Sequence, residues 1–348
     1  MKCTRCRERA ELALRSHNAA FCRACFLIYF NRQVERTIRQ DKMFTPDERI
    51  LVAVSGGKDS LALWDILIEQ GYQTEGFYLA LGIGTYSSQS QQKAEAFAKK
   101  RQVKLRIVQL EQEAVPVPLA VQFTRRMPCA ACGTMKRHFF DQAAHDGGFQ
   151  VLATGHNLDD EAARLLGNVL YWQTEYLARQ KAVLEPSHPK FVRKVRPLYR
   201  LSELETAAYA FFRGIDYIIE ECPNSAGATQ LFYKDILNRI DAKMPGSKRN
   251  FVQKFMHSAQ SLFARPEDSP PRECEKCGMP SYAPVCSFCN LVSEVERKHE
   301  HAQSTSKAEA DSSKQTGQAE AREPAPTARH PQVVSRYAFS GASHQLSA

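Results

Sequence analysis

The chain has 348 residues, enough for one large domain with small accessory modules, and 43% of them are hydrophobic. No apolar run approaches the roughly 18 residues of a membrane-spanning helix, and the N-terminal MKCTRCRERA carries charges where a secretory signal would be apolar. The formal net charge of +9 favours a polyanionic partner such as nucleic acid, so we expect a cytoplasmic protein without a membrane partner.

The first predicted element is a cysteine-bearing module over residues 1–30. It contains two CxxC pairs, the spacing at which two thiolates reach one metal ion: Cys3, Cys6, Cys22 and Cys25. Thiols stay reduced in a chain that is not exported, so a structural zinc ion is favoured over disulfides. The arginines of this module fit either contact with RNA phosphates or a merely solvated basic face: Arg5, Arg7, Arg9, Arg15 and Arg23.

A larger domain is predicted over residues 31–265, beginning with a basic helical stretch at 31–43. Apolar strand-like runs then alternate with helical patterns, and the strands read ILVAV, TEGFYLAL, LRIVQL and FQVLATG. This alternation predicts an α/β fold, a doubly wound parallel sheet with helices on both faces. Two further helices are expected near 203–213 and 230–243.

The run SGGKDS, Ser55 to Ser60, joins the first of these strands to a helix. There the backbone N–H groups and the helix N-terminus converge on one spot, which makes an anion site. Gly56 and Gly57 let the main chain approach a phosphate closely, and Lys58 adds charge. A Walker A loop is excluded because its upstream glycine is missing. The alternative is an ordinary glycine-containing turn.

A second polar segment, ATGHNLDDEA at 153–162, also follows a predicted strand, at the edge where open α/β sheets bind ligands. The carboxylates of Asp159, Asp160 and Glu161 suit magnesium held against phosphate oxygens. The alternative is an acidic first turn that only caps a helix.

Three cysteines lie in the middle of the chain, Cys129 and Cys132 in PCAACGTMKRH and Cys222 in EECPN. Three thiolates on one metal centre leave a coordination position open, which is typical of a catalytic centre. Unrelated buried cysteines and a redox CxxC pair are the alternatives.

A second cysteine quartet follows the proline-rich joint at 269–271 and predicts a zinc ribbon over residues 272–295. Its ligands would be Cys274, Cys277, Cys286 and Cys289. Residues 300–348 are rich in Ser, Ala, Gln and Glu, which predicts a disordered tail.

Over residues 1–295 the chain resembles the TtuA group of tRNA 2-thiouridine synthetases, which belong to the PP-loop ATP pyrophosphatases. The resemblance is carried by SGGKDSLALWD, the central cysteines, TGHNLDDEA, EECPN and the two quartets. It implies that ATP, with magnesium, adenylates the C2 oxygen of a tRNA uridine or ribothymidine, releasing pyrophosphate, and that sulfur then replaces this oxygen. Some relatives have His in place of Cys25, so the first zinc site of this chain would be all-thiolate.

The resemblance also implies roles for individual residues. It assigns a 4Fe-4S cluster to Cys129, Cys132 and Cys222, and catalysis to Lys136 and Asp160. The implied ATP site is larger: Ala53, Val54, Ser55, Gly56, Gly57, Lys58, Asp59, Ser60, Leu79, Gly155 and Asp160. Sulfur would arrive on the C-terminal thiocarboxylate of a small ubiquitin-like carrier protein, and the enzyme would be compatible with a homodimer.

Two other functions would use some of the same sequence features. A PP-loop ligase that transfers nitrogen to tRNA would have no use for the central cysteines. A non-catalytic, zinc-dependent RNA-binding protein would not need SGGKDS. The sequence does not separate a T-loop target from a wobble uridine.

Overall fold

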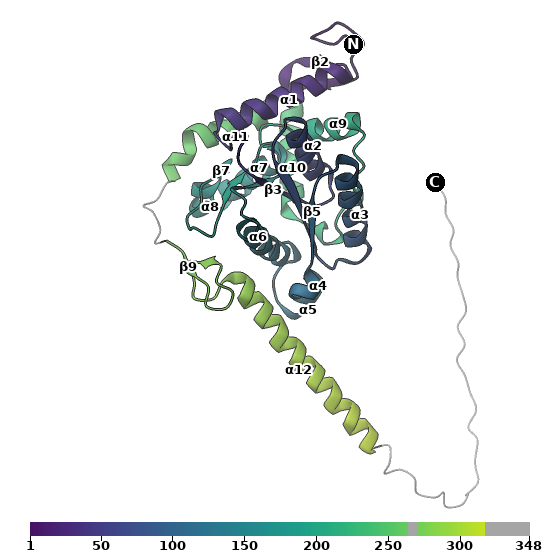
Figure 1. The fold of residues 1–348 in the computed structure, drawn as a ribbon, viewed down its shortest axis with the longest axis vertical. Helices are drawn as coiled ribbons and strands as arrows, with labels where there is room; N and C mark the ends of the chain where they lie inside the picture. Colours follow the sequence, from purple (N-terminus) through teal and green to yellow (C-terminus); the bar gives the residue numbers. More distant parts are fainter. Residues whose placement is uncertain (264–269, 317–348) are drawn as a thin grey trace, which may run out of the picture. The chain divides into compact units, whose positions relative to one another are not determined.

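A six-stranded sheet organises residues 1–299 in the computed structural model, which describes residues 1–263 and 270–316 (Figure 1). In spatial order the strands are β5 (Leu105–Gln109), β4 (Thr74–Ala80), β3 (Ile50–Val54), β6 (Val151–Thr154), β8 (Arg193–Val195) and β7 (Val183–Leu184). All neighbours pair in parallel except β7, which runs antiparallel to β8 at one edge. The predicted doubly wound α/β fold is confirmed, with this antiparallel edge strand added.

Each face of the sheet carries its own hydrophobic core. Ile50, Val52 and Val54 of β3 belong to one buried cluster, while Leu51 and Ala53 belong to the other. Successive side chains of a strand point to opposite faces, so the wholly apolar run ILVAV supplies both cores.

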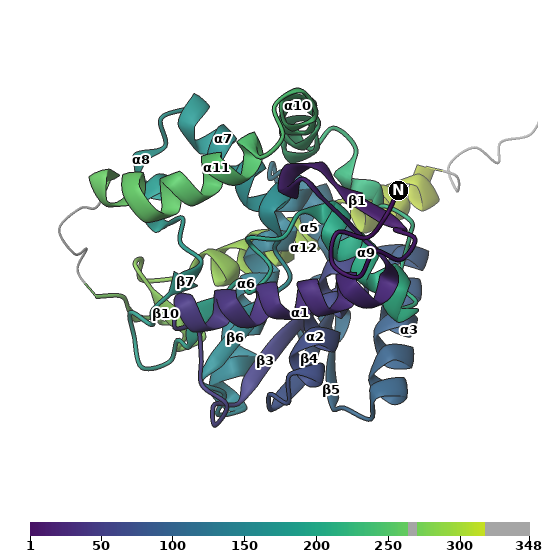
Figure 2. The same ribbon diagram turned by 90° about the horizontal axis from the view of Figure 1, so that it is seen from above.

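The first core is covered by α1, which crosses the sheet in Figure 2, and by six more helices. Their bounds are α1 (Arg23–Gln40), α2 (Lys58–Glu69), α3 (Gly84–Arg101), α7 (Leu158–Leu170), α9 (Glu203–Arg213), α10 (Thr229–Lys243) and α11 (Ser247–Lys254). The second core is covered by α4 (Leu110–Glu113), α5 (Val117–Phe123), α6 (Pro128–Asp146) and the first turns of α12 (Ser287–Thr316).

The N-terminal module is a β-hairpin joined directly to α1. Its strands are β1 (Leu12–Leu14) and β2 (Ala19–Phe21). The boundary that the sequence places at residue 30 falls inside α1, because Cys25 and Phe30 lie on the same helix and in the same buried cluster. The module therefore shares a core with the sheet.

The remaining helices and strands come from the second half of the sequence. Figure 2 shows α7, α8 (Thr174–Arg179), α10 (Thr229–Lys243) and α11 (Ser247–Lys254) grouped together. The C-terminal module consists of β9 (Arg272–Glu273), β10 (Pro280–Ser281) and the start of α12. The predicted tail begins within α12, which continues to Thr316, and residues 317–348 lie outside the described part of the chain. No described helix is long and apolar enough to cross a membrane.

Candidate functional site

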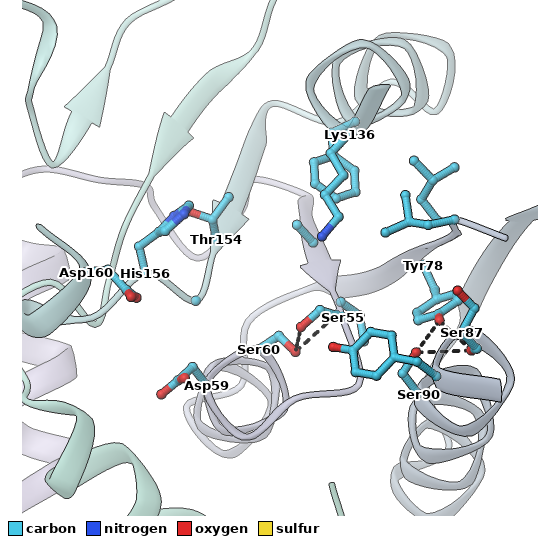
Figure 3. A pocket seen from close by; sticks show the side chains of 17 residues that line it. Ser55, Asp59, Ser60, Tyr78, Ser87, Ser90, Lys136, Thr154, His156 and Asp160 are labelled. Carbon is cyan, nitrogen blue, oxygen red and sulfur yellow. Dashed lines mark hydrogen bonds between the residues drawn. The ribbon is translucent and has the colours of Figure 1, made fainter. Parts of the chain in front are cut away.

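A cavity of about 280 Å³ lies beyond the carboxyl ends of β3, β4 and β6 (Figure 3). Eight of the residues predicted to bind ATP line it: Ala53, Val54, Ser55, Asp59, Ser60, Leu79, Gly155 and Asp160. Gly56, Gly57 and Lys58 do not line it and form the turn beside it. His156, in the predicted segment 153–162, also lines the cavity, and no local pattern in the sequence marks other lining residues such as Tyr78, Tyr86 and Ser90.

The conformation of the SGGKDS turn is fixed by contacts of its main chain. α2 begins at Lys58 with Gly57 as its N-cap, so the first N–H groups of the helix are free of intrahelical partners. The Ser55 N–H donates to Ser60 Oγ (3.1 Å), which ties the two ends of the turn together. Gly56 has φ +75°, and a Cβ there would lie 2.2 Å from the carbonyl oxygen of Ser90. Only glycine fits this close approach.

Lys58 is held by two carboxylates in this structure. Its Nζ lies 2.6 Å from Glu203 Oε1 and 3.1 Å from Asp59 Oδ2. Burial alone would lower the pKa of Lys58, but Asp59 and Glu203 raise it above its ordinary value. The ammonium is therefore charged, and it is already paired with both carboxylates.

The three carboxylates in the first turn of α7 have different partners. Asn157 and Asp160 form a capping box, in which the Asn157 side chain accepts from the Asp160 N–H and Asp160 Oδ2 accepts from the Asn157 N–H (3.0 Å). The other oxygen of Asp160 lies 2.6 Å from Lys234 Nζ. Asp160 thus caps the helix and also lines the cavity.

Asp159 and Glu161 do not line the cavity, so the expectation that all three carboxylates face the nucleotide is not met. Asp159 forms a buried ion pair with Lys248 (2.6 Å), and the fully buried Glu161 faces Arg196 (3.4 Å). A buried carboxylate needs a partner of this kind. Of the three, only Asp160 lines the cavity.

The central cysteines gather where α6 begins. Cys129 and Cys132 lie in its first turn, and Cys129 Sγ is 3.7 Å from the carbonyl oxygen of Asn224, two residues after Cys222. Burial raises the pKa of the Cys132 thiol, Lys136 lowers it, and Cys222 and Cys129 raise it further. The four side chains are therefore close enough for their charges to interact. Cys129 is exposed.

This cysteine centre adjoins the cavity. Burial, with contributions from Cys222 and Cys132, raises the pKa of Tyr86 to about 12, and Tyr86 lines the cavity. Lys136, one turn beyond Cys132 on α6, also points into it, as Figure 3 shows. Among the described residues, only the two quartets have their sulfurs within 4.8 Å of one another, so the three central thiols are not that close, and a 4Fe-4S cluster at them stays a prediction.

The two quartets have the geometry of single-ion sites. Within each, the four sulfur atoms lie within 4.8 Å of one another. Cys6 and Cys22 are 3.6 Å apart at sulfur, and Cys277 and Cys286 are 3.8 Å apart. Tetrahedral zinc with Zn–S bonds of about 2.3 Å places its sulfurs about 3.8 Å apart, so the residues fit zinc.

Comparison with known families agrees with this layout. The model of the PP-loop domain matches residues 28–229, and that of the N-terminal LIM domain of 2-thiouridine synthetase TtuA matches residues 2–27.

Curated relatives match along most of the chain. The tRNA-5-methyluridine(54) 2-sulfurtransferase of Thermus thermophilus is 45% identical over 299 residues, 86% of this chain and 93% of the relative. That of Pyrococcus horikoshii is 43% identical over 84% of this chain and 93% of its own. The cytoplasmic tRNA 2-thiolation protein 1 of Bos taurus is 29% identical over 85% and 88%.

Among solved structures, the chain is similar to the U34-tRNA thiolase NcsA from Methanococcus maripaludis with its [4Fe-4S] cluster. The TM-score is 0.71 at 26% identity, over 84% of this chain and 95% of the other.

Proposed function

Because the chain belongs to the PP-loop tRNA 2-sulfurtransferases, ATP-using enzymes that thiolate tRNA, we propose that its own target is the 5-methyluridine at position 54. The observation that carries this is the identity of 45% to a relative named for that nucleotide, against 26% to the U34-tRNA thiolase. The alternative target is a wobble uridine.

The phosphate loop would bind ATP with its triphosphate over the N-terminus of α2. The backbone N–H groups and Lys58 would neutralise the departing pyrophosphate, and a magnesium ion at Asp160 would share this charge. The C2 oxygen of the base attacks the α-phosphate, the bond to the β-phosphate breaks, and pyrophosphate leaves. The C2 oxygen, a poor leaving group by itself, is thereby bonded to the α-phosphate and can depart as part of AMP, a good leaving group.

Lys136 and Asp160 enter the cavity from different helices, α6 and α7 (Figure 3). From these positions they would orient the uracil ring and move protons as the C2 oxygen is activated and AMP departs. Cys129, Cys132 and Cys222 would hold a 4Fe-4S cluster, whose chemistry is to provide a binding position for the sulfur that enters at C2.

Several partners complete the proposal. Zinc in both quartets is supported by their sulfur spacing. A ubiquitin-like thiocarboxylate carrier as sulfur donor and a homodimeric state rest on the family resemblance. A cytoplasmic location is supported by the names of the cytoplasmic tRNA 2-thiolation relatives.

The test is nucleoside mass spectrometry on tRNA incubated anaerobically with the reconstituted enzyme, ATP and sulfide. We expect 2-thio-5-methyluridine, with AMP and pyrophosphate as coproducts. A tRNA carrying cytidine at position 54 should stay unmodified, and Lys58→Ala should abolish thiolation while leaving tRNA binding intact. Sulfur found only at position 34 would refute the proposed target, and release of ADP and phosphate would refute the proposed use of the phosphate loop.

A further inference from the structure

One carboxylate bridges two lysines beside the phosphate loop. Glu203 Oε1 lies 2.6 Å from Lys58 Nζ, and Glu203 Oε2 lies 3.1 Å from Lys234 Nζ. Lys234 in turn lies 2.6 Å from Asp160 Oδ1. Glu203 and Lys234 thus link the lysine of the phosphate loop to the carboxylate on the other side of the cavity, in a row of alternating charges.

The position of Glu203 is fixed by its surroundings. It is the first residue of α9, its N–H donates to Asp159 Oδ2 (2.9 Å), and its carbonyl accepts from Thr206 Oγ1 (3.0 Å). The same Thr206 hydroxyl also contacts Asp59 Oδ1 on α2, so its single hydrogen is shared between the two acceptors. Both ends of the Glu203 main chain are therefore held, which fixes the point from which its carboxylate reaches the two lysines.

An incoming triphosphate competes with Glu203 for Lys58. The polyphosphate carries several negative charges, and at close range an ammonium favours the group with the greater charge. Once Lys58 turns to the phosphates, Glu203 keeps Lys234 as its remaining cation, so its charge stays paired in the loaded state.

We infer that Glu203 and Lys234 are positioning residues for adenylation: Glu203 holds Lys58 until ATP displaces it, and Lys234 keeps the Asp160 carboxylate in place throughout. This rests on the proposed function, because it assigns the phosphates to Lys58 and a role in catalysis to Asp160. Neither residue belongs to a sequence motif of the phosphate loop.

The experiment compares equilibrium ATP binding with single-turnover pyrophosphate release at saturating tRNA, in the full-length reconstituted enzyme. Glu203→Gln removes the competitor for Lys58, so ATP should bind about threefold or more tightly. It also removes the negative charge that pairs with Lys234, so pyrophosphate release should slow about tenfold. Lys234→Met should slow release about tenfold with a much smaller change in ATP affinity, and Lys234→Arg should restore most of the rate.

Arg239→Met is the matched control, because it removes an exposed cation from the same helix as Lys234. It should change neither quantity. General damage to the fold would move affinity and rate in parallel and would not be rescued by arginine. If Glu203→Gln fails to fold, Glu203→Asp, which is too short to reach both lysines, should show the same opposite shifts. Parallel shifts in these variants would overturn the inference, whereas a wild type that releases no pyrophosphate would overturn the proposed function instead.

Discussion

At the scale of single residues, Gly56 makes the sharpest prediction. Alanine there would require φ +75° and would place its Cβ against the Ser90 carbonyl, so the turn must open and lose its phosphate-binding shape. Gly56→Ala should lower the free energy of unfolding by more than about 2 kcal/mol and abolish ATP binding.

Gly71 provides the control for this substitution. It has φ +79°, and a Cβ there meets nothing within 4 Å. Gly71→Ala should therefore cost only the backbone strain, about 1 kcal/mol, and leave ATP affinity unchanged. Equal effects of the two alanines in urea titrations would show that the contact with Ser90 has no importance.

Some residues of the site could be predicted from the sequence, and others could not. Ser55 to Ser60 were predictable because a phosphate-binding turn is made by consecutive residues. Glu203 was not, because it lies 145 residues from Lys58 and no local pattern marks it as a partner. The sequence likewise could not show that Asp159 turns toward Lys248 and away from the cavity.

At the scale of secondary-structure elements, the start of α6 predicts a labile metal centre. Cys129 is exposed, so a cluster there would be open to substrate and also to oxygen. Replacing Cys129, Cys132 or Cys222 with Ser should remove both the brown chromophore and thiolation, while ATP still binds. Cys286→Ser, in a quartet, should keep the chromophore. Three variants that thiolate normally without oxygen would contradict a cluster at this helix.

The first turn of α9 predicts a specific dependence of stability on pH. Burial would raise the pKa of Glu205, but hydrogen bonds from His17, Ser202 and Tyr29 lower it from 4.5 to about 2. A carboxyl whose pKa is lowered on folding stabilises the protein above its unfolded pKa. That contribution, about 3 kcal/mol, disappears as the pH falls from about 4.5 towards 2.

Glu205→Gln should therefore lose stability at neutral pH and show a flatter acid limb in urea titrations made between pH 5 and the acid limit of folding. Glu8→Gln, an exposed glutamate of the N-terminal module, should behave as wild type. Parallel pH profiles for wild type and Glu205→Gln would contradict the assigned hydrogen bonds.

Helices and strands with a long apolar or amphipathic pattern could be predicted from the sequence, and very short strands could not. The run ILVAV is wholly buried and was recognised as a strand. β7 and β8, with two and three residues, are too short to show a pattern, and they form only because β6 offers β8 a free edge. The predicted domain boundary near residue 30 falls within α1, because a cysteine spacing says nothing about the helix that follows it.

At the scale of the whole molecule, the two cysteine quartets should differ in their effect on stability. Cys3 and Cys25 belong to the same buried cluster as β3, whereas Cys274, Cys286 and Cys289 form a small cluster of their own. Loss of zinc from the first should therefore weaken the sheet domain, and loss from the second should act more locally.

Elemental analysis should find about two zinc atoms per chain. Both Cys3→Ser and Cys274→Ser should lower the melting temperature or solubility, and Cys3→Ser should do so more strongly and in one cooperative transition. A sheet domain that melts unchanged in Cys3→Ser would refute the shared core.

The hydrogen bond from Tyr29 to Glu205 and the contact of His17 with the same carboxylate join the N-terminal module to the helix that carries Glu203 (2.6 and 3.3 Å). This joint limits how such enzymes can be recombined. A chimera that takes residues 1–30 from a relative brings new side chains against a buried charge, and so must import the matching first turn of α9 as well. In evolutionary terms, the two segments are expected to be inherited and exchanged as one unit, although 176 residues separate Tyr29 from Glu205.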